Sequence, residues 1–99
     1  MAADVDDLEG VWRVERVSGL LPPLYRVRKV IVGDRGETRI GPLPGVPFRV
    51  KGLRLEYHAP LGGFVDLLEP EGDGYYGRAT FLGREYGQFR MRREASSPR

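Results

Sequence analysis

Glycine and proline interrupt this chain at short intervals, and the segments between them are about five to nine residues long and rich in branched and aromatic apolar residues. Segments of this kind are typical of β-strands joined by tight turns. Because most connections contain a glycine suited to a hairpin, consecutive strands should pair as an antiparallel meander. The sequence predicts strands at about 10–18, 25–32, 37–41, 46–50, 53–58, 64–69, 75–82 and 85–93.

Apolar residues alternate with arginine along these segments, which is typical of a sheet with one buried and one solvated face. The numerical parity of the apolar positions changes around Lys51-Gly52. A hairpin there keeps both sets on one face, and a β-bulge at Gly52 is the alternative explanation. The expected buried face contains Trp12, Val14, Tyr25, Val27, Ile31, Ile40, Val46, Phe48, Val50, Leu53, Leu55, Tyr57, Phe64, Leu68, Tyr75, Ala79, Phe81, Phe89 and Met91.

A sheet with one apolar face must bury that face, and no long segment with a helical period is available to cover it. The sheet can close into a barrel, fold into a sandwich or dimerise face to face, and consecutive hairpins favour the barrel. We therefore predict an all-β fold of about eight antiparallel strands in an up-and-down meander closed into a small barrel. Residues 1–94 should form this single domain, and residues 95–99 a disordered C-terminal tail.

The only tryptophan follows a glycine at the start of the first predicted strand, in Gly10-Val11-Trp12. In a closed meander the last strand lies antiparallel to the first, which brings Trp12 near Arg92 and Arg93. Parity favours Arg93, because it shares a face with Phe89 and Met91, and a guanidinium over an indole ring contributes about 0.5–2 kcal/mol.

This combination resembles the calycin group, the lipocalins and fatty-acid-binding proteins, in which a Gly-x-Trp motif begins the first strand and an arginine of the last strand packs on the tryptophan. It also resembles short bacterial proteins with an N-terminal Gly-x-Trp motif. The resemblance implies a lipocalin-like barrel that holds a small molecule, with Gly10, Trp12 and Arg93 in structural roles. The last strand has no Arg-x-Tyr motif of the kind that holds a ligand carboxylate in that group.

The composition limits the classes of function. The chain has no cysteine, which excludes disulfides and cysteine-based metal sites or nucleophiles, and its formal net charge is only +2. No apolar run reaches the roughly 20 residues of a membrane span, and the acidic start is unlike a signal peptide. We therefore expect a cytoplasmic protein without a membrane partner. The absence of asparagine and the preference for arginine over lysine fit a GC-rich or heat-adapted bacterial source.

Three charged residues fall on the apolar face by strict alternation, namely Arg16, Lys29 and Asp66. A charge inside a barrel is costly unless it is paired or holds a ligand. Arg16 or Lys29 could meet an anionic head group, or all three could lie at the rim or pair with one another. The other candidate ligand-binding residues are the tyrosines and the phenylalanine of the same face, Tyr25, Tyr57, Tyr75 and Phe81, with Gly77, Ala79 and Gly87 expected to leave space.

No catalytic, metal or cofactor motif is present in the sequence. His58 has no nucleophile motif near it, and the acidic run from Asp66 to Asp73 lacks the spacing of a calcium loop. We therefore expect no enzymatic activity, no metal and no cofactor.

The leading functional prediction is a barrel that binds a small hydrophobic or amphipathic molecule. The alternative is an interaction or assembly module, such as a homodimer, using the outer apolar residues. Nucleic-acid binding by the outer arginines and tyrosines is less favoured. The outer apolar residues in question are Val30, Val32, Val65, Leu67 and Leu82.

Overall fold

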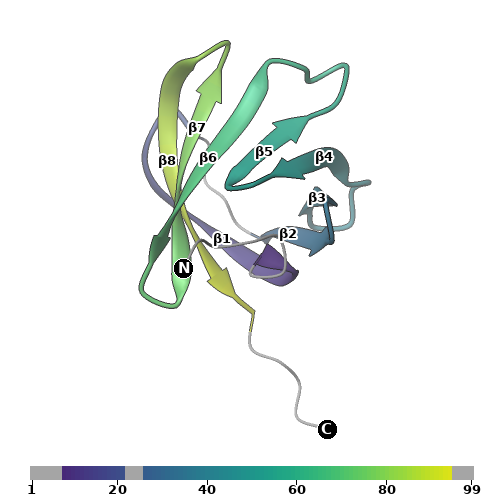
Figure 1. Cartoon of the computed structure of the whole chain (residues 1–99), viewed down its shortest axis with the longest axis vertical. Helices are drawn as coiled ribbons and strands as arrows, with labels where there is room; N and C mark the ends of the chain where they lie inside the picture. Colours follow the sequence, from purple (N-terminus) through teal and green to yellow (C-terminus); the bar gives the residue numbers. More distant parts are fainter. Residues whose placement is uncertain (1–7, 22–25, 95–99) are drawn as a thin grey trace, which may run out of the picture.

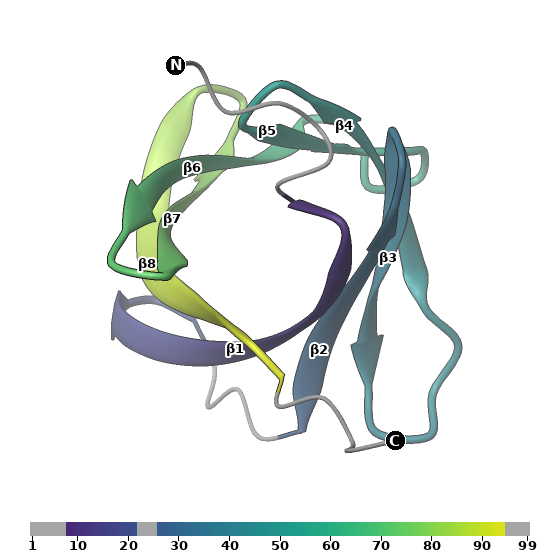
Figure 2. The same cartoon turned by 60° about the horizontal axis from the view of Figure 1, so that its bottom comes forward.

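The computed structural model is a single antiparallel sheet of eight strands closed into a barrel in simple meander order (Figures 1 and 2). The structure describes residues 8–21 and 26–94. The strands are β1 (Gly10–Gly19), β2 (Val27–Val32), β3 (Arg35–Ile40), β4 (Val46–Lys51), β5 (Arg54–Tyr57), β6 (Phe64–Glu71), β7 (Gly74–Phe81) and β8 (Arg84–Arg93). The predicted fold class is therefore confirmed. The expected tail, residues 95–99, and Tyr25 lie outside the described residues.

The barrel closes through pairing of its first and last strands. Trp12 lies opposite Arg93 and Val14 opposite Met91 in the ladder between β1 and β8. The predicted contact is confirmed as well, because the guanidinium carbon of Arg93 lies 4.2 Å from the centre of the Trp12 ring. The Arg93 guanidinium also donates a hydrogen bond of 2.7 Å to the carbonyl of Glu9. The side chain thus ties the last strand to the chain that precedes the first.

The parity change after β4 is a hairpin and not a bulge. Lys51 pairs with Arg54, and Val50 pairs with Leu55, so the turn consists of residues 52–53. Gly52 has a φ of +59°, a conformation that glycine adopts without the steric cost that a side chain carries. The turn lies one residue further along than the sequence predicted, and Leu53 belongs to it rather than to β5.

The two ends of the barrel differ in their connections. Residues 33–34, 52–53 and 72–73 form two-residue turns at one end, where β1 begins and β8 ends, and we call this the closed end. The longer connections between β1 and β2, β3 and β4, and β5 and β6 lie at the opposite end with the β7–β8 turn, and we call this the open end. In Figure 1 the β5–β6 segment and the β7–β8 turn are both at the top, and the β6–β7 turn is at the lower left.

The closed end is filled by tightly packed large side chains. The Trp12 ring meets Tyr75 edge-on at 5.4 Å between ring centres, and its Nε1 donates a 2.8 Å hydrogen bond to the carbonyl of Leu8. Trp12, Leu8 and Met91 are fully buried. Leu8 was not among the predicted core residues, because it precedes the first strand and carries no strand alternation. The Trp12 side chain therefore plugs this end of the barrel.

Two of the predicted interior residues are exposed to solvent. Ile40 ends β3 and Phe81 ends β7, and each exposes more than two fifths of its surface. Alternation fixes the face of a residue but not its depth, so residues at the strand ends reach the rim. Phe81 packs there against Phe64, with 4.5 Å between ring centres.

The predicted outer apolar patch is also divided. Val30 and Val32 belong to β2, whereas Val65 and Leu67 belong to β6. Three strands separate β2 from β6 in one direction around the barrel and three in the other. These two pairs of side chains therefore face different sides of the molecule and form no single surface.

Replacing Trp12 with alanine should lower the free energy of unfolding by about 3–5 kcal/mol, since it empties a fully buried site. Replacing Arg93 with methionine keeps much of the aliphatic stem and should cost about 0.5–2 kcal/mol, the range of the lost cation–π contact. Urea unfolding followed by circular dichroism measures both. An equal loss in the two variants would contradict this ranking.

Candidate functional site

A chamber of about 280 Å³ occupies the half of the barrel nearer the open end. It reaches the surface, because Ile40 and Leu61 in its wall are exposed. Both hydrophobic strand residues and loop residues line it, together with a few polar side chains. The lining residues are Val14, Leu21, Val27, Lys29, Thr38, Ile40, Val46, Tyr57, Leu61, Phe64, Asp66, Ala79, Tyr86 and Phe89.

The size of the interior side chains explains why this half of the barrel is hollow. Val14, Val27 and Ala79 face the chamber, whereas the closed end holds Trp12 and Met91. Val14, Val27 and Ala79 belong to β1, β2 and β7 on one side of the barrel, and side chains this short leave part of the interior of an eight-strand barrel unfilled.

The expectation that Gly77 and Gly87 leave free space is wrong. A Cβ atom at Gly77 would collide with the ring of Phe89, and one at Gly87 would lie 2.6 Å from Cγ of Leu21. These glycines make room for neighbouring side chains. Of the three small residues in that prediction, Ala79 borders the chamber.

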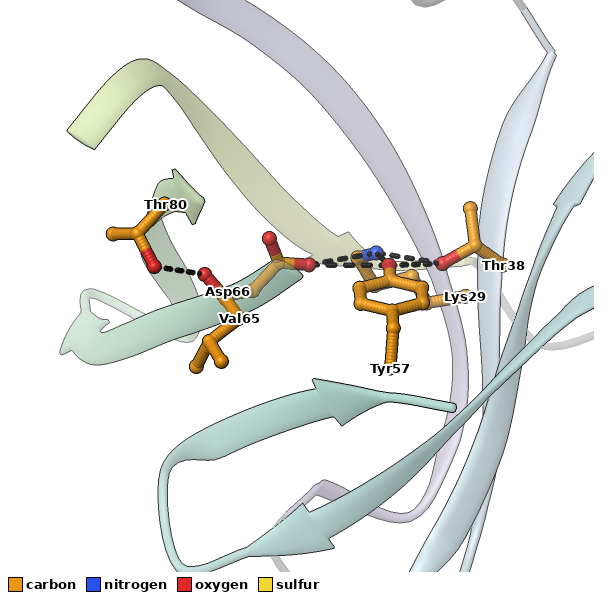
Figure 3. A network of polar contacts seen from close by, with 6 residues as sticks. All are labelled: Lys29, Thr38, Tyr57, Val65, Asp66 and Thr80. Carbon is orange, nitrogen blue, oxygen red and sulfur yellow. Dashed lines mark hydrogen bonds and ion pairs between the residues drawn. The ribbon is translucent and has the colours of Figure 1, made fainter. Parts of the chain in front are cut away.

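A buried polar cluster forms the floor of the chamber (Figure 3). Lys29 on β2 and Asp66 on β6 are almost fully buried, with 3% and 6% of their surfaces exposed. The ammonium of Lys29 lies 3.1 Å from Oδ2 of Asp66 and donates to Thr38 Oγ1 and Tyr57 Oη, both at 2.7 Å. Tyr57 Oη in turn lies 2.7 Å from Thr38 Oγ1 and 3.2 Å from Asp66 Oδ2. We call these four residues the central network.

Aromatic rings surround the buried ammonium. The Nζ atom of Lys29 lies 5.4 Å from the ring centres of Phe48 and Tyr57, and 5.5 Å from that of Phe89. The negative faces of such rings stabilise a cation that has lost its water. Lys29 therefore keeps its charge in the interior through both hydrogen bonds and ring contacts.

Protonation in the central network follows from its geometry. Burial by itself would lower the pKa of Lys29, but the interactions with Tyr57 and Asp66 outweigh it and raise that pKa above its usual value. Burial is the main cause that raises the pKa of Tyr57, and the nearby Asp66 carboxylate adds to it. At neutral pH Lys29 is therefore an ammonium and Tyr57 a neutral phenol.

The ammonium of Lys29 has no spare donor for a ligand. It has three N–H groups, and Asp66, Thr38 and Tyr57 supply three acceptors. Asp66 makes these contacts through Oδ2 alone, and its other oxygen points away from the network in Figure 3. The charges of Lys29 and Asp66 cancel, so the floor is polar and has no net charge.

Of the predicted ligand-binding residues on the inner face, some border the chamber and others do not. Lys29, Tyr57 and Asp66 meet in the central network and border the chamber. Tyr75 packs against Trp12 at the closed end and Phe81 lies at the rim, so neither borders the chamber.

Arg16 does not lie inside the barrel as strict alternation predicted. It still pairs with the buried Phe89, but it lies near the open end, where its exposed guanidinium turns to the β1–β2 connection. It donates to the carbonyls of Leu21 at 2.8 Å and Gly19 at 2.7 Å. Leu21 borders the chamber, so these hydrogen bonds of Arg16 hold part of the chamber wall in place.

Several lining residues were not predicted. Thr38 lies opposite Lys29 in the β2–β3 ladder, and its parity with Ile40 on β3 could have placed it on the inner face. Leu21 and Leu61 come from connections, where no periodic pattern indicates direction. Tyr86 has an even number, whereas the inner-facing Phe89 and Met91 of the same strand have odd numbers. It borders the chamber because the register of β8 with β7 shifts beside Ala79.

The described residues show no other chemical site. His58 is exposed, and within residues 8–21 and 26–94 no group of three or more His, Cys, Asp or Glu side chains could hold a metal ion. In the same ranges no helix has the length and apolarity to cross a membrane.

Comparison of the chain with protein-family models, with curated proteins and with solved structures finds no match. The function must therefore be argued from the chamber and its surroundings.

Replacing Lys29 with methionine should reduce the free energy of unfolding by about 3–5 kcal/mol, because the Asp66 carboxylate stays buried without its cation. A Lys29→Met, Asp66→Leu double variant removes both charges and should recover most of that loss. Urea unfolding at pH 7 measures this cycle. A double variant as unstable as Lys29→Met would contradict the interpretation of the network as a neutralised pair.

Stability should fall in alkaline solution. The folded protein holds the Lys29 proton above the ordinary pKa of 10.5 and the Tyr57 proton above 10.0, so the unfolded chain releases both first. The contribution is fully present below pH 10 and is lost above it, by up to about 1.4 kcal/mol per pH unit for each proton. Urea midpoints from pH 7 to 11 should fall less steeply in the Lys29→Met, Asp66→Leu variant, and equal slopes would contradict this prediction.

Proposed function

We propose that the protein binds a small, mainly apolar molecule in the chamber, with an uncharged hydrogen-bond donor at the end that meets the central network. The observation that carries the proposal is the chamber itself, which has hydrophobic walls and a polar floor. Ligand pockets in proteins combine these two features. The protein is then a carrier or sensor of such a molecule and performs no chemistry on it.

The volume limits the size of the ligand. The chamber of about 280 Å³ is roughly twice the 150 Å³ apolar cavity that accepts benzene. Molecules of about 10–15 non-hydrogen atoms fit this space, such as two fused aromatic rings or a medium-length alkyl chain. Haem and long-chain fatty acids are too large for it.

The polar floor limits the chemistry of the ligand. An anionic head group would have to displace Asp66 from Lys29, because the ammonium is already fully coordinated. A hydroxyl or amide can instead donate to the second Asp66 oxygen without breaking any contact in the network. Of the two interpretations that the sequence left open for these charges, this proposal does not keep the anionic head group, and a neutral donor takes its place.

The resemblance to calycins supports the same function, since those barrels hold small molecules in their interiors. The contact between Trp12 and Arg93 closes the barrel in the way that resemblance implies. Binding of nucleic acid receives less support, because several outer arginines are already paired with glutamates. These pairs are Arg28–Glu94, Arg39–Glu37, Arg54–Glu56, Arg78–Glu69, Arg90–Glu71 and Arg92–Glu15.

Calorimetric titration with naphthalene, 1-naphthol and 1-naphthoate at pH 7.5 tests the proposal. Naphthalene should bind, 1-naphthol should bind about tenfold more tightly through its hydroxyl, and the anionic 1-naphthoate should bind least. An Ala79→Leu variant fills the chamber and should weaken binding of all three. Val32→Leu is the matched control, since Val32 is exposed on the outer surface.

Failure of all three compounds to bind the native protein would disprove the proposed function. Tightest binding by 1-naphthoate would retain the chamber as the site but overturn the neutral donor.

A further inference from the structure

The exposed apolar side chains are concentrated at the open end. Among the described residues, all of the large exposed hydrophobic side chains lie there except Val11 and Val32. Those at the open end belong to all four connections or to the strand ends next to them. They are Leu20, Ile40, Leu43, Leu61, Phe81 and Leu82. We call this set the apolar rim.

The backbone of the β7–β8 turn is a second observation that indicates a function for the apolar rim. Leu82 has a φ of +52° and the following Gly83 has a φ of +85°. In a two-residue hairpin turn with positive φ at both residues, the first residue is usually Asn, Asp or Gly. The other two-residue turns begin with Gly33, Gly52 and Gly72, which adopt a positive φ freely.

Leu82 is also 72% exposed to solvent. A leucine at this position is disfavoured both by its backbone and by its contact with water. A strained residue of this kind points to a function outside the fold.

The charges around the apolar rim are mostly positive. The described parts of the connections, residues 19–21, 26, 41–45, 58–63 and 82–83, contain no Asp or Glu. Arg16, Arg26 and Arg84 lie within or next to them. The neighbouring acids are Glu85 and Glu37, whose carboxylate lies against Gly45 and pairs with Arg39. The turns of the closed end, by contrast, contain Asp34 and Asp73.

We infer that the apolar rim docks on the surface of an anionic lipid bilayer, with the mouth of the chamber facing the lipid. Exposed leucines beside arginines suit the interface, where apolar side chains enter the acyl boundary and arginines meet anionic head groups. Two copies of the chain docked rim to rim would bring like charges together, which favours the lipid over a second copy. The absence of a spanning helix among the described residues concerns insertion through a membrane, whereas this contact is peripheral.

Co-sedimentation with vesicles tests the inference. The native protein should pellet with vesicles of two parts phosphatidylcholine to one part phosphatidylglycerol, less with phosphatidylcholine alone, and less as salt rises. Leu82→Asp should reduce binding about tenfold and keep the fold, because aspartate tolerates a positive φ better than leucine does. Val32→Asp is the matched control at the closed end, 64% exposed, and should bind as the native protein does.

Native protein that stays in the supernatant with anionic vesicles would overturn the inference, as would equal losses in Leu82→Asp and Val32→Asp. A dimer in analytical ultracentrifugation that only Leu82→Asp dissociates would instead assign the rim to a second copy. Binding of naphthalene by Leu82→Asp should match that of the native protein, since Leu82 does not border the chamber. The experiments therefore test the docking surface and the proposed ligand site independently of each other.

Discussion

The pairing of β1 with β8 is the constraint on which the whole structure depends. An eight-strand sheet with one apolar face has two edges, and each edge exposes unpaired backbone groups until the two meet. The ladder from Trp12 to Gly19 on β1 satisfies these groups and encloses the apolar face in one step. Arg93 reinforces this seam from the last strand, over the indole of Trp12. Without the seam there would be neither an interior nor a site.

The interior created by closure is divided by the central network. Toward the closed end the side chains fill the barrel as a protein core does, and toward the open end they leave a chamber. Lys29 and Asp66 come from opposite sides of the barrel and meet at the boundary between the two regions. A buried ion pair adds little to stability compared with an apolar pair of the same size, and in the function that we propose its role is to give the floor of the chamber its specificity.

The sequence predicts local features of this protein better than depth and long-range pairing. Alternation and glycine turns predict the strands, and closure together with parity predicts the contact of Trp12 with Arg93. Alternation also places Lys29 and Asp66 inside, but their pairing depends on the diameter of the barrel and on the register of four intervening ladders. Arg16 lies opposite Phe89 as alternation predicts, but alternation does not show depth, and near the open end its guanidinium reaches the backbone of the β1–β2 connection.

The up-and-down order of the eight strands determines where the barrel can be attached to a surface or to another protein. Since β1 begins and β8 ends at the closed end, a tether joined to the first residue of β1 or the last residue of β8 would lie on the side opposite the chamber mouth. The barrel could therefore be fixed to a sensor surface with its mouth directed toward the bulk solution. The strand order of the barrel would thus give every attached molecule the same orientation on such a surface.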